Sequence, residues 1–489
     1  MPIASLPGKY GIGTFGKSAY KFVDDLSLAG QSYWQILPLG PTSYGDSPYQ
    51  SFSTFAGNPY FIDIEMLIEE GLLKKEEADK CDFGKNREKI DYGKIYNSRF
   101  DLLKKAFLRS NIEKSKEYKA FEKKNALWLD NYALFMAVKN SFGGRAYIEW
   151  DEPIRKREKN ALKEYREKYA QEIAFYKYLQ FLFAKQWMAL KEYANGKKVQ
   201  IIGDIPIYVA FDSADTWANP ELFQIDENGY PTEVAGCPPD AFSATGQLWG
   251  NPLYDWKYHK QTEYKWWIER IRHCFEIYDV VRVDHFRAFD EYYSIPYKDK
   301  TAEFGKWKKG PGMPLFRAIK AQLGDVPMIA EDLGYLTDSV IKLVKMTGYP
   351  GMKVLQFAFD SREDSDYLPH NYNENSIVYT GTHDNDTVLG WFNSIKKDDR
   401  NMAMEYINRT GFESDSDLVF SFIKLAMASV SKICIIPMQD YLALGNEARI
   451  NIPSTVGGNW SWRMKSNAFT KKLARQMRDM ARLYARVEK

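Results

Sequence analysis

The stretch Asp279-Val280-Val281-Arg282-Val283-Asp284-His285-Phe286-Arg287 decides the fold and suggests the chemistry. Its apolar residues predict a short buried strand, in which a charged side chain is costly unless it is paired. Arg282 and Asp284 lie two residues apart, so in a strand their side chains point to the same side. The nearby positive charge keeps the aspartate ionised, as a nucleophile requires. This segment alone is equally compatible with a structural ion pair.

Similar apolar stretches recur along the chain and alternate with helical patterns. Strands that alternate with helices indicate parallel βαβ units, and eight such units close a (β/α)8 TIM barrel. We therefore predict an α/β fold built on such a barrel, with inserted and largely helical subdomains. The predicted strands are 33–39, 199–208, the strand that ends at Asp284, 326–332, 352–359, 376–384 and 433–440. Helices are predicted at 18–28, 171–194, 263–275, 314–323, 339–346 and 418–429.

The whole chain, 1–489, is predicted to be a single catalytic barrel with two insertions. Residues 64–195 are rich in Lys and Glu and show long helical patterns, which indicates a helical insertion with solvated charged faces. Residues 211–256 contain many Pro, Gly, Asp and Trp residues. We interpret them as a long loop that forms an active-site loop subdomain.

The composition restricts the possible partners. A net charge of +2 gives no general case for binding to nucleic acid or to an anionic membrane. The four cysteines lie far apart without metal-ligand spacing, which fits reduced thiols in a cytoplasm. The first residues show no secretory signal, and no apolar run reaches ~18 residues. We expect a cytoplasmic protein that is a monomer or a weak homodimer.

A glycine-rich segment near the start provides an alternative from another functional class. Gly11-Ile12-Gly13-Thr14-Phe15-Gly16-Lys17-Ser18 matches both the dinucleotide pattern and the P-loop pattern. Both patterns need a buried strand immediately before the glycines, and Pro2, Pro7 and Gly8 disfavour one there. A P-loop nucleotide-binding protein therefore stays the weaker hypothesis. ATP binding that depends on Lys17 would support it.

Acidic residues lie at or near the ends of several predicted strands. In a (β/α)8 barrel the catalytic groups occupy the C-terminal ends of the strands. One such acid could be a helix cap or an ion-pair partner, but a repeated pattern with histidines beside two of the acids indicates a site. The acids are Asp204, Asp284, Glu331, Asp384 and Asp440, and the histidines are His285 and His383.

Clustered carboxylates suit the cleavage of a glycosidic bond. One ionised carboxylate attacks the anomeric carbon, and one protonated acid gives its proton to the leaving oxygen. Crowding of like charges raises the pKa of one acid and keeps it protonated. A Mg²⁺ or Mn²⁺ site made from the same acids is the alternative. Aromatic residues make up 15% of the chain, and those in the loops favour a sugar ligand.

At these acids the sequence resembles the 4-α-glucanotransferases, also called amylomaltases or disproportionating enzymes, of glycoside hydrolase family 77. The matching segments are 45–51, 238–243, 246–252, 279–289, 330–334, 309–312, 348–352, 381–385 and 458–460. The resemblance covers nearly the whole chain. It implies a retaining transferase that acts on maltooligosaccharides, glucose and α-1,4-glucans in starch, glycogen or maltose metabolism, without a cofactor or a metal.

The resemblance also implies roles for single residues. Asp284 resembles the nucleophile that forms a β-glucosyl–enzyme intermediate, and Glu331 resembles the general acid/base. Asp384 resembles the third acid, which holds hydroxyls of the donor sugar. Arg282 would keep Asp284 ionised, and two histidines, His285 and His383, would bind hydroxyls near the cleaved bond. Further implied substrate positions are Tyr49, Asp240, Phe242, Trp249, Phe357, Asp360 and Asn451, of which Trp249 and Phe357 are also compatible with plain packing.

Transfer requires that the covalent intermediate meets a sugar hydroxyl before water. The loop 211–256 and the loop near Tyr49 are our candidates for the shield. An amylase-like α-glucan hydrolase with the same three acids is the alternative within the class. Members of the family usually begin with an apolar strand, whereas this chain begins Met1-Pro2-Ile3-Ala4-Ser5-Leu6-Pro7. We therefore expect the first barrel strand to be largely missing and the stability to be lower than with it.

Overall fold

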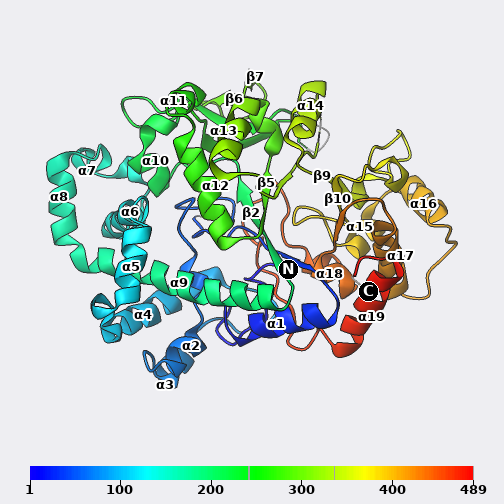
Figure 1. Ribbon diagram of the computed structural model, residues 1–489, viewed down its shortest axis with the longest axis horizontal. Coiled ribbons are helices and arrows are strands. Elements are labelled where there is room, and N and C mark those ends of the chain that lie inside the picture. The colour runs from blue at the N-terminus through cyan, green and yellow to red at the C-terminus, as the bar shows by residue number, and fades with distance from the viewer. Residues whose placement is uncertain (44, 240–242, 335, 488–489) are drawn as a thin grey trace.

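A computed structural model describes residues 1–43, 45–239, 243–334 and 336–487. Seven parallel strands form its centre, in two sheets that follow one another (Figure 1). They are the seven strands that the sequence predicts. The first sheet has the order β1 (Tyr33–Gln35), β2 (Gln200–Pro206), β5 (Val280–Asp284) and β8 (Met328–Ala330). The second sheet consists of β9 (Gly351–Val354), β10 (Ser376–Tyr379) and β11 (Ile433–Ile435), with β10 in the middle.

The two sheets join on one side and are separate on the other. At the joint between β8 and β9, the amide of Ala330 donates to the carbonyl oxygen of Pro350 at 3.0 Å. Among the described residues no ladder pairs β1 with β11, and a cavity of about 440 Å³ lies between them. Met1 and residues of both strands line this cavity. The strands thus curve like a (β/α)8 barrel in which one strand position is unpaired.

Helices cover the outside of the strands (Figure 1). The first of them, α1 (Lys17–Leu28), buries Ala19, Phe22, Val23 and Leu26, the spacing of an amphipathic helix. Within the described chain, no helix combines the length and the apolar character needed to cross a membrane. The other helices of the barrel are α12 (Lys265–Ile277), α13 (Met313–Leu323), α14 (Asp338–Thr347), α15 (Val388–Ser394), α16 (Lys397–Tyr406), α17 (Asp415–Met427), α18 (Met438–Tyr441) and α19 (Lys471–Leu483).

The glycine-rich segment before α1 does not have the context of a nucleotide-binding loop. Residues 1–16 form turns and bends, so no strand precedes Gly11. Lys17, which would be the P-loop lysine, instead forms an ion pair with Glu69 at 2.6 Å. The chain therefore lacks the strand on which both nucleotide patterns depend.

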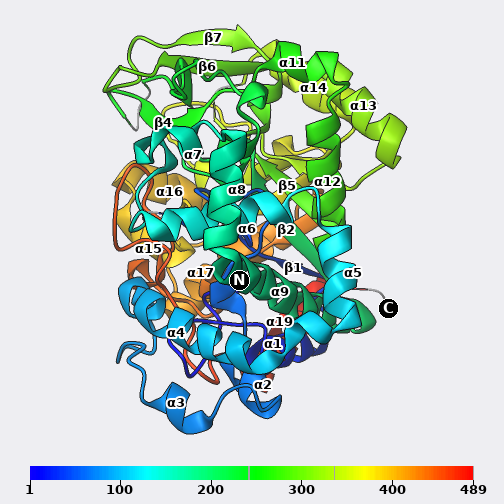
Figure 2. The same cartoon turned by 90° about the vertical axis from the view of Figure 1, so that its left-hand side faces the viewer.

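The segment predicted as a helical insertion consists of helices and their connections, and it lies along one side of the barrel (Figures 1 and 2). Its last helix returns to the barrel, where the indole nitrogen of Trp187 donates to the carbonyl oxygen of Ile277 at 3.0 Å. The helices are α2 (Ile64–Glu69), α3 (Lys75–Asp79), α4 (Tyr92–Ser110), α5 (Lys116–Lys124), α6 (Leu129–Ser141), α7 (Glu152–Arg155), α8 (Lys159–Lys168) and α9 (Ala170–Gly196).

An antiparallel sheet that the sequence analysis missed stands at one end of the molecule (Figure 2). Its order is β4 (Gln247–Pro252), β3 (Glu233–Cys237), β6 (Glu291–Pro296) and β7 (Lys306–Lys309). The stretch 211–256 is therefore more than a loop, since it contains β3, β4 and a short helix, α10 (Ala214–Ala218). Helix α11 (Trp256–Gln261) follows. Because β3 and β4 follow β2 in the chain and β6 follows β5, this sheet lies beyond the C-terminal ends of the barrel strands.

Candidate active site

Asp284 is the last residue of β5, and a buried ion-pair network holds it. Arg282 donates from Nη2 to Asp284 Oδ1 at 2.9 Å, and from Nη1 to both carboxylate oxygens of Asp204 at 2.8 Å each. Asp204 lies opposite Arg282 in the β2–β5 pairing and is 1% exposed. Burial raises the pKa of Asp204, while Arg282 opposes this shift. Arg282 is thus fixed between two carboxylates, of which Asp204 is buried and Asp284 is partly exposed.

Glu331 directly follows β8 and accepts two backbone hydrogen bonds. The amide of His285 donates to Oε2 at 2.7 Å, and the amide of Leu333 donates to Oε1 at 2.8 Å. Burial and the charge of Asp284 raise the pKa of Glu331 to about 7, although Arg282 and these amides oppose the shift. Glu331 is therefore partly protonated at neutral pH and can both donate and accept a proton.

His285 connects these two acids through its backbone, since it follows Asp284 and its amide binds Glu331. Its φ of 54° is left-handed, a conformation that is costly for a side-chain-bearing residue and that aims its amide at Glu331. The ring packs edge-on against Trp249 with a centroid distance of 4.8 Å. Burial lowers the pKa of His285 to about 4, so the ring is neutral at pH 7. Its Nε2 is buried and has no hydrogen-bond partner among the described residues.

Asp384 lies beyond the end of β10, on a segment that runs to α15. Its side chain is 49% exposed, and Asn451 donates to Oδ1 at 2.6 Å. His383 Nε2 is 3.4 Å from Asp384 Oδ2. Burial opposes the ionisation of Asp384, but His383 and Asn451 outweigh it and hold the pKa of the carboxyl well below its usual range. The group is ionised throughout the physiological pH range.

Tyr49 links the two halves of the site. Its hydroxyl donates to Asp204 Oδ2 at 2.9 Å, and its oxygen lies 3.3 Å from His383 Nδ1. The rings of Tyr49 and His383 stack with a centroid distance of 4.9 Å. The structure therefore brings together the three acids, Arg282, both histidines, Tyr49, Trp249 and Asn451 around the ends of β2, β5, β8 and β10.

The other predicted substrate residues are less closely connected to this group. Phe357 is 38% exposed and packs edge-on against Tyr367 at 5.4 Å. Asp360 accepts hydrogen bonds from Arg362, which lowers the pKa of Asp360 to about 2. Asp240 and Phe242 lie outside the described residues.

The sequence analysis noted Asp204 as an acid on a strand but gave it no role in the site. An acidic residue between Ile202 and Ile205 in a strand needs a cation, and that signal could have paired it with Arg282. Arg449 was missed altogether, and it donates to the carbonyl oxygen of Asp384 at 2.8 Å. Nothing in its local sequence marks it. Within the described part of the chain, no three His, Cys, Asp or Glu side chains gather as a metal site would need.

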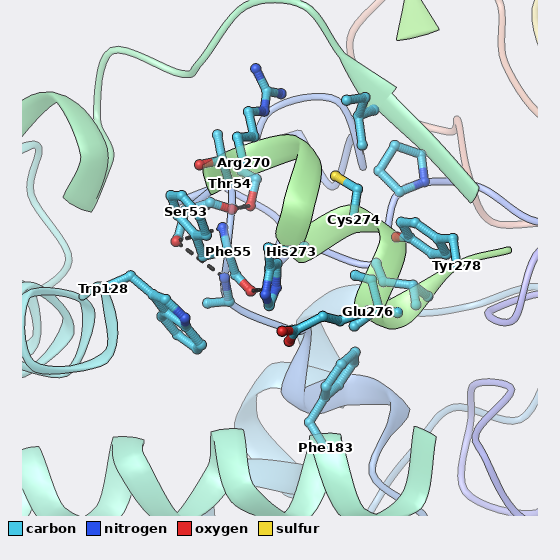
Figure 3. Close-up of a pocket in the computed structure, with 18 of the residues that line it drawn as sticks. Ser53, Thr54, Phe55, Trp128, Phe183, Arg270, His273, Cys274, Glu276 and Tyr278 are labelled. Atoms are coloured by element: carbon cyan, nitrogen blue, oxygen red, sulfur yellow. Dashed lines mark hydrogen bonds between the residues drawn. The ribbon is translucent and has the colours of Figure 1, made fainter. Parts of the chain in front are cut away.

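Trp128, Phe183 and His273 are among the residues that line a separate cavity of about 240 Å³ (Figure 3). Trp128 and Phe183 enter it from the helical insertion, and the Trp128 ring lies 5.9 Å from the ring of His273 in α12. Tyr49 and Asp204 belong to its wall, whereas the three acids Asp284, Glu331 and Asp384 do not line it. The cavity and the group of site residues thus share Tyr49 and Asp204.

Comparison with known proteins agrees with this arrangement. A family model described as 4-alpha-glucanotransferase matches residues 1–469. The chain belongs to the 4-alpha-glucanotransferase family. A 4-alpha-glucanotransferase of Clostridium butyricum is 51% identical in an alignment of 490 positions that covers 100% of each chain. The 4-alpha-glucanotransferase of Thermus thermophilus is 46% identical, covering 98% of this chain and 96% of its own.

Solved structures of the family share the fold. The structure of the amylomaltase from Streptococcus agalactiae in complex with acarbose has a TM-score of 0.96 at 43% identity, covering 100% of this chain and 99% of that one. The amylomaltase from Corynebacterium glutamicum has a TM-score of 0.75 at 18% identity over 99% of this chain and 73% of its own, a likeness of fold alone. The predictions of an α/β fold and of membership in this family are confirmed.

Proposed function

We propose that this protein is a 4-α-glucanotransferase that moves α-1,4-glucan segments from a donor maltooligosaccharide to the 4-OH of glucose or of another glucan. Family membership supports the reaction class. The roles of Asp284 and Glu331 are assigned from one observation, which is that their carboxyl groups have different surroundings. Asp284 is held by Arg282 at 2.9 Å, whereas burial raises the pKa of Glu331 to about 7.

In the first half-reaction, Asp284 attacks the anomeric carbon of the donor. A bond forms between the carboxylate oxygen and that carbon while the glycosidic bond breaks, and Glu331 gives its proton to the departing oxygen. In the second half-reaction, Glu331 takes the proton of the acceptor 4-OH. That oxygen attacks the anomeric carbon, and the bond to Asp284 breaks. Two inversions retain the α configuration and exchange one α-1,4 bond for another.

The remaining groups hold the donor sugar. Asp384 is ionised and half exposed, so it accepts hydrogen bonds from two ring hydroxyls, and these bonds strengthen as positive charge develops at the anomeric carbon. The buried Nε2 of the neutral His285 and the ring of His383 bind hydroxyls near the cleaved bond. Trp249 supplies an aromatic face beside His285.

Transfer rather than hydrolysis depends on keeping water from the intermediate. The antiparallel sheet that contains β3 and β4, together with the loop near Tyr49, lies over the strand ends and forms the shield in this proposal. The alternative is an amylase-like α-glucan hydrolase with the same three acids.

Incubation of the pure protein with maltotriose, followed by chromatography of the products, tests both readings. We expect glucose together with a ladder of longer maltooligosaccharides, and loss of both in Asp284→Asn. Asp279→Asn is the matched control, since Asp279 precedes the same strand and accepts from the amide of Ile201 at 2.7 Å. The control should stay active. Glucose and maltose with nothing longer would show a hydrolase instead.

A further inference from the structure

The segment 380–387, which carries His383 and Asp384, is tied at both ends to one buried side chain. Asp440, in α18, is 1% exposed. Its Oδ2 accepts from the hydroxyl of Thr380 at 2.6 Å, and its Oδ1 accepts from the amide of Val388 at 2.8 Å. Thr380 directly follows β10 and Val388 begins α15, so one carboxylate spans the two ends of the segment.

Burying a carboxylate is costly, and here both of its oxygens are used on this segment. An apolar side chain would fill the same space without that cost. Burial and the neighbouring Asp386 raise the pKa of Asp440 to about 6, against the opposing effect of its two hydrogen bonds. Above that pH both oxygens are acceptors, which suits the two donors at Thr380 and Val388.

The orientation of Asp384 depends on where the segment begins and ends. Its side-chain contacts, to His383 and Asn451, lie where the side chain is 49% exposed, and its carbonyl oxygen accepts from Arg449. Inside the segment, Asn385 Oδ1 accepts from the amide and from the hydroxyl of Thr382, each at 2.9 Å. These bonds keep the local turn, but they do not fix it relative to β10 and α15. Gln356 and Asn446 bind Asp386 in the middle of the segment, at 2.8 and 2.6 Å. The Asp440 carboxylate adds the link that joins its two ends.

We propose that Asp440 is a positioning residue of the transfer reaction, which holds Thr380 and Val388 together and so presents Asp384 to the donor sugar. This inference rests on the proposed function of the same site. Asp440 does not touch the sugar. Its effect reaches the reaction through the placement of Asp384, whose hydrogen bonds matter most in the transition state.

Two substitutions of Asp440 distinguish a role in placing Asp384 from a role in filling space. In Asp440→Ala both hydrogen bonds are lost, and we expect kcat on maltotriose to fall about 10- to 100-fold, as for other groups that orient a catalytic residue. The KM should change less than about threefold, because the lost contact acts in the transition state. In Asp440→Asn the amide oxygen still accepts from Val388 and the amide nitrogen faces the hydroxyl of Thr380. We expect kcat of Asp440→Asn to be about tenfold higher than kcat of Asp440→Ala.

A third variant and a matched control make the outcome decisive. Thr380→Val removes one of the two bonds from the other side and should lower kcat at least about threefold. Asp279→Ala removes a carboxylate that accepts from the amide of Ile201 at 2.7 Å and from Asn195 Nδ2 at 2.8 Å, at the opposite end of the strands. It should lower the melting temperature but leave kcat unchanged.

Wild-type kcat in Asp440→Ala, or no recovery in Asp440→Asn, would overturn the inference. If Asp440→Ala does not fold, Thr380→Val decides, and an unchanged kcat there would overturn it too. Failure of the proposed function looks different, because the wild-type protein would then form no ladder of longer maltooligosaccharides.

Discussion

The two sheets of the barrel hold their acids in different ways. In the first sheet, Asp284 lies within β5, which pairs with β2 on one side and with β8 on the other. Its partner Arg282 is 3% exposed and bonds two carboxylates. In the second sheet, Asp384 lies beyond β10 on a connecting segment, and its side chain is 49% exposed. One acid is fixed by strand pairing and buried charge. The other lies on a connecting segment, with exposed contacts of its own and with the buried Asp440 at the ends of that segment.

This difference matches the two tasks. A nucleophile must stand at one place relative to the anomeric carbon, because small displacements are costly in rate. An acid that holds ring hydroxyls must admit and release a sugar in every cycle. We therefore expect substitutions around Asp284 and Glu331 to have large effects on rate or stability. Substitution of Asn451 or Arg449, which contact Asp384 directly, should have smaller effects.

The largest effect is expected at Glu331. Glu331→Gln keeps only one of the two backbone hydrogen bonds, because an amide has a single acceptor oxygen, and it cannot transfer a proton, so kcat should fall about 10²- to 10⁴-fold. Because burial raises the pKa of Glu331 to about 7, the wild-type acid loses its proton above that pH and kcat should decline on the alkaline side. The residual activity of the variant should lack this alkaline decline. A pH profile of kcat on maltotriose checks both points, and an unchanged alkaline limb in the variant would remove Glu331 from this role.

The first sheet was also the easier one to predict from sequence. Val280, Val281 and Val283 indicate a buried strand, and the charge of Arg282 within it requires a partner. The strand could therefore be predicted from the local sequence, whereas the site needed the acids of the other strands. All seven parallel strands were predicted because each contains a short apolar stretch.

The parts that could not be predicted depend on contacts between distant segments. The antiparallel sheet was missed because β3 contains Gly236, β4 contains Gly250 and Pro252, and β7 is mostly lysine, so none shows a clean alternation. Asp384 was placed at the end of a strand, whereas β10 ends at Tyr379 and a connecting segment carries the acid. The role of Arg449 is set by folding alone.

The next effect concerns stability. Arg282→Met leaves Asp204 and Asp284 without their shared cation, and breaking such a buried pair costs about 3–5 kcal/mol. The matched variant beside Asp384 is Arg449→Met, which removes one bond to the carbonyl oxygen of Asp384 and one to that of Asn451 and should cost about 1 kcal/mol. Urea denaturation followed by fluorescence measures both.

A second substitution identifies the cause of the loss. Adding Asp204→Asn to Arg282→Met removes one of the two uncompensated carboxylates and should restore part of the lost stability. Equal losses for Arg282→Met and Arg449→Met would break the proposed contrast between the two sheets.

A smaller effect, on kcat, is expected at the exposed contact between Asn451 and Asp384. Asn451→Ala removes the 2.6 Å hydrogen bond to Asp384 and should lower kcat about fivefold, the equivalent of about 1 kcal/mol. Because His383 and Asn451 together hold the pKa of Asp384 down against burial, that pKa should move upward and the acid limb of kcat should shift to higher pH. Asn446→Ala is the control, since Asn446 Nδ2 donates at 2.6 Å to the neighbouring Asp386. A shift of equal size in both variants would mean that the contact to Asp384 is not special.

The smallest effect, on stability, is expected between β1 and β11, which do not pair with each other in the described residues. Residues added before Met1 would run back along β1 into the cavity of about 440 Å³ between β1 and β11. Four added residues with alternating apolar side chains gain backbone pairing and burial but lose chain entropy, which leaves a net stabilisation of about 1 kcal/mol. The gain should appear mainly in the second sheet, because β11 is its unpaired edge. Amide hydrogen exchange should therefore slow at Ile433–Ile435 and stay unchanged in β5. A Gly-Ser extension of the same length is the control. Equal melting temperatures for the two extensions would contradict the prediction that an additional strand stabilises this side of the barrel.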